Sequence, residues 1–101
     1  MEAKLYADAI LDRFESITNI KKEEVLSMNR VPNVNNVRIS TYFILKKLGF
    51  SLNKIARAMN RVNHTTIIHG IQSFEDLLEA NDKDLINIVI KYADSSEGVE
   101  L

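Results

Sequence analysis

The side chains best suited to contacting another molecule lie in Asn63-His64-Thr65-Thr66, followed after two isoleucines by His69. Amide, imidazole and hydroxyl groups donate and accept hydrogen bonds, and groups of this kind read the edges of bases in duplex DNA. The apolar residues that follow recur at helical spacing, so the polar side chains stand in the first turns of an amphipathic helix. Two interpretations stay open: Asn63 simply caps a buried helix, or the residues after it are held out to bind something.

The two histidines do not predict a metal site or a catalytic centre. His64 and His69 stand about 140° apart around a helix, so they cannot share a metal as residues four apart can. No Asp or Glu occurs between Arg30 and Phe74 to orient either imidazole for acid–base catalysis. Cysteine and a Gly-x-x-x-x-Gly-Lys-Ser/Thr phosphate loop are also absent. We therefore expect no enzyme activity, no metal, no cofactor and no bound nucleotide.

Charge is segregated along the sequence, although the net charge is only −1. The acid-free stretch from Arg30 to Phe74 carries seven Lys and Arg residues, while the flanks hold six basic and all 14 acidic residues. A cationic centre between acidic ends is typical of a surface that faces a polyanion. The charge pattern therefore favours a nucleic-acid partner.

The elements around this centre all read as helices. Three glycines, one proline and the lack of alternating Val, Thr and aromatic runs predict an all-α fold. We expect one compact helical domain over residues 1–94 and a flexible tail at 95–101, because 101 residues supply a single modest core. The pattern predicts helices at 3–17, 22–28, 37–48, 52–59 and 64–79, and a last helix capped by Asn81 or Asp82.

Caps, breaks and apolar stripes set the details of these helices. Val31-Pro32-Asn33 is expected to end the second helix, since the residue before a proline avoids the helical region. Asn35 or Asn36 is expected to cap the third helix, which we expect to be the buried centre of the domain. The positions expected inside are Leu5, Ile10, Leu11, Phe14, Ile17, Val25, Leu26, Ile39, Phe43, Ile44, Leu48, Leu52, Ile55, Ala56, Met59, Ile67, Ile71, Phe74, Leu78, Leu85, Ile88, Val89 and Tyr92.

The fourth and fifth helices outline a helix-turn-helix motif. Ser51 caps a short helix, and a tight connection leads to the helix that opens after Asn63. At helical spacing, Lys54, Arg57 and Arg61 fall within about 60° of one another and predict one basic stripe opposite the apolar side. The polar start of the second helix of the pair is the end that reaches base edges in a major groove.

The same residues resemble a known family. Ser51-Leu52-Asn53-Lys54-Ile55-Ala56-Arg57-Ala58-Met59, followed by Asn63-His64-Thr65-Thr66-Ile67-Ile68-His69, is similar to the C-terminal DNA-binding domain (domain IV) of the bacterial replication initiator DnaA, whose signature ends in Asp-His-Thr-Thr-Val. The similarity extends from about Tyr6 to Tyr92. It implies a multi-helix fold with a helix-turn-helix of the Trp-repressor-like, DnaA C-terminal type.

The resemblance implies a role for each matching side chain. Asn63, His64 and Thr65 would contact bases, and Thr66 and His69 would bind the flanking backbone. With the basic stripe and the cations near the third helix, the residues expected at DNA phosphates are Arg30, Arg38, Lys54, Arg57, Arg61, Thr66 and His69.

Three positions depart from the family pattern. The family's aspartate before the histidine is Asn63 here, which adds a donor and can change the preferred base. Val62 replaces the arginine that usually precedes that aspartate, with Arg61 beside it. Pro32 stands where the family has an arginine that enters the minor groove, and Arg30 lies two residues earlier. The family's recognition sequence is therefore not assumed for this chain.

The expected function is sequence-specific binding of double-stranded DNA at sites like the DnaA box, in replication initiation or its regulation. The alternative is a helical protein-interaction module, or a phage or mobile-element regulator, that keeps the fold with altered or lost DNA specificity. The chain is expected to be an excised domain or a small stand-alone relative, and a homodimer or tandem-site binding stays open. No membrane span or signal sequence is predicted, so we expect a cytoplasmic, nucleoid-associated protein of a bacterium or phage.

Overall fold

The computed structural model describes residues 2–27 and 29–95, and its regular elements are all helices. Within these residues no strand occurs, so the predicted all-α class is confirmed. Residues 96–101 of the expected tail lie outside the described residues, whereas Ser95, also expected in the tail, is the last residue of a helix. The elements are α1 (Ala3–Thr18), α2 (Lys22–Leu26), α3 (Pro32–Lys47), α4 (Leu52–Ala58), α5 (His64–Glu79) and α6 (Lys83–Ser95).

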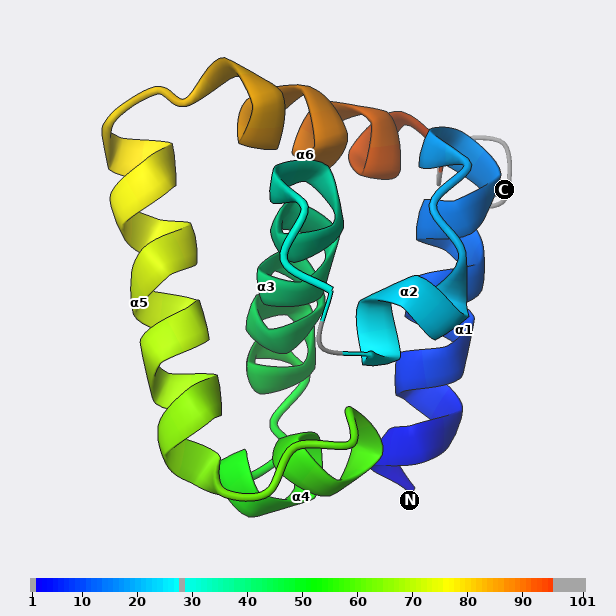
Figure 1. Cartoon of the computed structure of the whole chain (residues 1–101), viewed down its shortest axis with the longest axis vertical. Helices are drawn as coiled ribbons and strands as arrows, with labels where there is room; N and C mark the ends of the chain where they lie inside the picture. The colour runs from blue at the N-terminus through cyan, green and yellow to red at the C-terminus, as the bar shows by residue number, and fades with distance from the viewer. Residues whose placement is uncertain (1, 28, 96–101) are drawn as a thin grey trace.

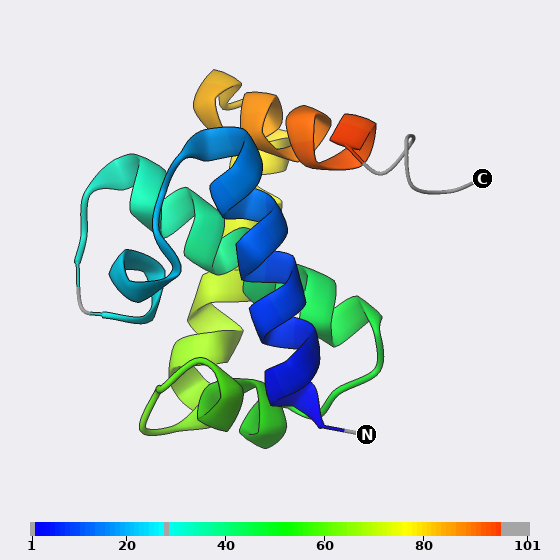
Figure 2. The ribbon, with the colours of Figure 1, turned by 90° about the vertical axis from the view of Figure 1, so that its right-hand side faces the viewer.

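The central element of the domain is α3 (Figure 1). In that view α1 and α5 flank it on opposite sides, while α4 and α6 cross near its two ends. The side view shows α1 running across the bundle between α6 and α4 (Figure 2). α3 is buried along most of its length, from Val34 to Leu45. This confirms the expected central buried helix, and it leaves the start of α5 at the edge of the bundle.

Two buried hydroxyl groups of α3 are satisfied within the helix itself. Ser40 Oγ donates to the carbonyl of Asn36 at 2.7 Å, and Thr41 Oγ1 donates to that of Val37 at 2.8 Å. Hydroxyls bonded back to the preceding turn lose little on burial, because their hydrogen-bonding capacity is used. The helix can therefore carry small polar residues through the core.

Residues at the helix ends follow the capping rules. Ser51 Oγ accepts the N–H of Lys54 at 3.3 Å, as predicted. At the start of α6, Asp82 Oδ2 accepts the N–H of Leu85 at 3.1 Å, so of the two expected caps it is Asp82 that acts. Residues with positive φ, which Asn and Gly tolerate best, follow α1, α3, α4 and α5. They are Asn19, Gly49, Asn60 and Asn81.

The predicted start of the third helix was wrong. α3 begins at Pro32, not near Val37, so Asn35 and Asn36 lie inside the helix rather than at its cap. Proline suits the first helical position because its φ is already fixed and the N–H it lacks would have no partner there. α2 ends at Leu26, before the proline, so Pro32 opens one helix instead of closing another.

Two apolar residues expected inside lie at the surface. Leu5 is 68% exposed, because it stands between Ala3 and Ala7 in sequence and so faces away from the side of α1 that they bury. Leu48 is 53% exposed and follows the last residue of α3, where the chain turns at Gly49. Both predictions assumed a wider apolar face than the packing needs.

Candidate nucleic-acid interface

The first turn of α5 is capped by the side chain of Asn63. Asn63 has an extended backbone, with φ −144°, and its Oδ1 accepts the N–H groups of Thr65 at 3.0 Å and Thr66 at 3.4 Å. The predicted cap is confirmed. His64 and Thr65 are exposed, and within the described residues their side chains make no hydrogen bond or ion pair. Their polar atoms are therefore available to a ligand.

The orientation of these side chains follows from the buried face of α5. Ile67, Gly70 and Phe74 are buried against the bundle, and Phe74 stacks on Phe43 with ring centroids 4.3 Å apart. Anchoring this stripe turns the opposite sector of the helix outward. A rigid helix thus carries the exposed polar groups at its free end, as base reading in a major groove requires.

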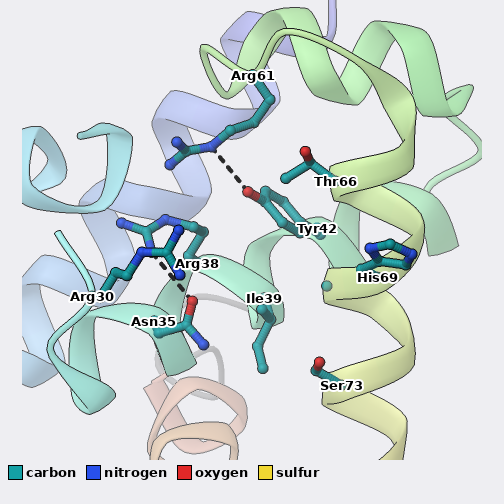
Figure 3. A pocket seen from close by; sticks show the side chains of 10 residues that line it. Arg30, Asn35, Arg38, Ile39, Tyr42, Arg61, Thr66, His69 and Ser73 are labelled. Carbon is teal, nitrogen blue, oxygen red and sulfur yellow. Dashed lines mark hydrogen bonds between the residues drawn. The ribbon is translucent and has the colours of Figure 1, made fainter. Parts of the chain in front are cut away.

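A hollow of about 280 Å³ lies between α3 and α5, close to His64 and Thr65 at the start of α5 (Figure 3). Cationic side chains come from the α3 side and from the connection after α4, while hydroxyl and imidazole groups come from α5. The hollow gathers five of the seven residues predicted at phosphates. It is lined by Arg30, Asn35, Arg38, Ile39, Tyr42, Arg61, Thr66, His69, Gly70 and Ser73.

Arg38 is a buried arginine, only 7% exposed, whose donors face backbone carbonyls at the end of α2. Its Nε donates to Val25 O at 2.9 Å, and its Nη2 donates to Ser27 O at 3.1 Å. Its Nη1 donates to Asn35 Oδ1 at 3.2 Å. Burial lowers the pKa of Arg38 from its usual value, and the charge of Arg61 lowers it further. Since a guanidinium stays protonated in proteins, the result is concentrated positive charge at the hollow.

Arg61 does not belong to the predicted basic stripe. α4 ends at Ala58, and the side chain of Arg61 turns toward α2 and α3 instead. Its Nε donates to Tyr42 Oη at 3.1 Å, and its Nη2 donates to Ser27 O at 2.9 Å and to Val25 O at 3.1 Å. The stripe was wrong at this residue because the helical spacing was extended past the end of the helix. Arg38 and Arg61 thus share two carbonyls and bridge α2 to the helix-turn-helix.

The segment that carries Arg30 is anchored by the same bridge. Ser27 Oγ accepts the N–H of Asn29 at 3.1 Å, and Asn29 Oδ1 accepts the N–H of Val31 at 2.8 Å. Arg30 itself is exposed and reaches the rim of the hollow. Its backbone is therefore fixed through contacts that begin at the two arginines.

Lys54 and Arg57 form a second, separate cationic area on α4. Both side chains are exposed and stand on the side of α4 away from the buried Ile55 and Ala58. They do not line the hollow. The predicted phosphate residues accordingly fall into two groups, and their contacts with DNA stay predictions.

Sequence reasoning missed three residues that shape the hollow. Tyr42 is buried, with 1% of its surface exposed, and its hydroxyl also accepts a hydrogen bond from Arg61. Asn35 pairs with Arg38 at a spacing of three residues, which becomes visible once the helix is known to start at Pro32. Gly70 lets α5 approach Tyr42, and a glycine inside a helical pattern was the available signal.

Residues 7–73 match the family described as the bacterial DnaA protein helix-turn-helix. The chain belongs to this family. A segment of 58 residues, 56% of the chain, is 41% identical to the chromosomal replication initiator protein DnaA of Aquifex aeolicus. Over 83 residues, 81% of the chain, it is 29% identical to the DnaA protein of Thermotoga petrophila. These matches cover 14% and 19% of the two relatives, so the chain spans only a small part of their length. No solved structure matches the chain.

Membership of the DnaA helix-turn-helix family confirms the resemblance drawn from the residues around Thr65, and it gives the departures from the family pattern a structural setting. Val62, at the position usually held by arginine, is 99% exposed at the tip of the connection. Arg61 beside it turns inward to the hollow. None of the described helices is long and apolar enough to cross a membrane.

Proposed function

We propose that this DnaA-family domain binds double-stranded DNA in a sequence-specific way, at sites related to the DnaA box, in replication initiation or its regulation. His64 and Thr65 read base edges from the start of α5, and Arg30, Arg61, Thr66 and His69 engage one strand of the backbone at the hollow. Lys54 and Arg57 engage phosphates from α4. Arg38 adds positive potential while its own donors hold α2.

One observation supports this proposal more than the others: α5 carries the exposed side chains of its first turn and also lines the arginine-rich hollow within about one turn of them. Thr66 and His69 line the hollow, while His64 and Thr65 lie directly before them in the first turn of α5. Phosphate contacts fix the position of a protein on the duplex and base contacts give specificity, so groups of both kinds close together on α5 suit a sequence-specific binder. The charges that act on Arg38 include two further arginines, Arg61 and Arg30, which favours an anionic ligand there.

The test begins with selection from a random duplex library, followed by titration of the selected duplex at several salt concentrations. Four to six phosphate contacts predict that log affinity falls linearly with log salt, with a slope of about −4 to −5. A helical protein-interaction module would select no sequence and show no such slope. That result would reject the proposal.

Two variants separate reading from positioning. Thr65→Ala should lower affinity for the selected duplex by about 1–3 kcal/mol while leaving random duplexes nearly unchanged. Lys54→Ala should weaken all duplexes alike and reduce the steepness of the salt slope by about one. Equal losses on selected and random duplexes for Thr65→Ala would contradict its assignment as a base-reading residue.

A further inference from the structure

The side-chain oxygen of Asn63 is fully used inside the protein. A carbonyl oxygen has two lone pairs, and Oδ1 accepts two backbone N–H groups, those of Thr65 and Thr66. The amide nitrogen Nδ2 makes no hydrogen bond within the described residues, and Asn63 is exposed. What the residue offers outward is therefore an NH₂ group with two donors and no acceptor.

An aspartate at this position would behave in the opposite way. Its carboxylate has two equivalent oxygens, so one can cap the helix while the other faces outward as an acceptor. Asparagine keeps the cap but exposes a hydrogen-bond donor where aspartate would expose an acceptor. Because the cap occupies the one remaining oxygen, replacing a carboxylate oxygen by NH₂ reverses the direction of the hydrogen bond that the residue can make outward.

We propose that Asn63 is a specificity-determining residue that presents only donors to the DNA and so selects a base with an acceptor edge in the major groove. This inference rests on the proposed function. Guanine suits the group best, because its O6 and N7 are adjacent acceptors, and thymine O4 and adenine N7 can also accept. Cytosine, whose major-groove edge offers the N4 donor, is rejected where it faces Asn63.

The experiment uses the whole chain and a random duplex library, with Asn63→Asp and Asn63→Ser selected in parallel with the wild type. Serine and aspartate both cap helices well, so α5 should stay folded in each variant. We expect wild-type selections to show guanine at one position, Asn63→Asp selections to show cytosine or adenine there, and Asn63→Ser selections to lose the preference. Titration of four duplexes that differ only at that position should show about a tenfold discrimination against cytosine by the wild type.

Each outcome bears on a separate claim. A wild type that selects no sequence rejects the proposed function, and with it this inference. A wild type that selects a sequence but prefers cytosine at the position altered by Asn63→Asp overturns the donor assignment and leaves the proposed function intact. Selections that are identical for all three proteins show that Asn63 caps the helix and reads nothing. Circular dichroism of the three proteins is the matched control for folding.

Discussion

Gly70 is the point of closest approach between α5 and the buried helix α3. A Cβ built on this residue would lie 2.5 Å from Tyr42 Cδ2, 2.7 Å from Tyr42 Cε2 and 3.4 Å from Ile39 Cγ2. Ordinary carbon contacts are about 3.5–4.0 Å, so the tyrosine ring would have to move by about 1 Å. Tyr42 is 1% exposed and its hydroxyl is bonded to Arg61, so a shift of the ring would disturb both its packing and that hydrogen bond.

The free-energy change for Gly70→Ala is the balance of two terms. Alanine improves the helix by about 0.5–1 kcal/mol, because glycine loses more backbone entropy on folding. Overpacking a filled core costs about 1–3 kcal/mol. The clash involves two ring atoms, so we place the cost in the upper half of that range and expect a net destabilisation of about 1–2 kcal/mol. For a domain of this size, this corresponds to a Tm lower by about 5–10 °C.

Thermal and urea unfolding of Gly70→Ala measure this change directly. Ser73→Ala is the matched control, because Ser73 lies one turn further along α5 and is exposed, whereas Gly70 is buried. A Gly70→Ala protein as stable as the wild type, or more stable, would refute the tight packing of α5 on Tyr42. The same variant should weaken DNA binding more than Ser73→Ala, because moving Tyr42 releases Arg61.

Three further variants test other parts of the structure. Phe74→Ala should destabilise the domain by about 3–5 kcal/mol in urea unfolding, whereas Ile44→Ala, at a half-buried site, should cost less; equal costs would contradict their different burial. Arg61→Ala and Arg30→Ala should reduce DNA affinity by less in combination than the sum of their separate effects, while Arg57→Ala and Arg30→Ala should add; additivity in both pairs would show that Arg61 does not position Arg30. Burial raises the pKa of Tyr42 above its ordinary 10.0, so its contribution to stability is complete below pH 10 and is lost as pH rises through the raised value; the fall in Tm above pH 10 should be shallower in Tyr42→Phe, and identical slopes would exclude this linkage.

The parts of the fold that sequence predicted well are those fixed by local rules. The expected bounds of α5 match the observed His64–Glu79, because a strong cap and an uninterrupted apolar stripe define both ends. The cap at Ser51 was equally local. The start of α3 was missed because Pro32 is compatible with either role, ending one helix or opening another. The folded structure distinguishes them, since α3 begins at Pro32 and Val34 is already buried in the core.

The candidate site was only partly predictable for the same reason. Exposure of His64 and Thr65 follows from the periodicity of one helix. The inward course of Arg61 does not, since its acceptors at Val25 and Ser27 lie 36 and 34 residues away in the chain. No spacing rule covers such a contact, and it appears only when α2 is packed beside the helix-turn-helix.

The shared carbonyl acceptors of Arg38 and Arg61 also limit how the domain can be reused. Residues 51–79 contain both helices of the motif and look like a portable module. Transplanted alone onto another scaffold, these residues would keep the exposed side chains at the start of α5. They would lose the hydrogen bonds with the carbonyls of Val25 and Ser27, and with them the contacts that orient the segment around Arg30. A chimaera designed from this protein must therefore carry the chain from Lys22 onward, because Arg38 and Arg61 join the α2 region to the helix-turn-helix through a shared carbonyl of Ser27.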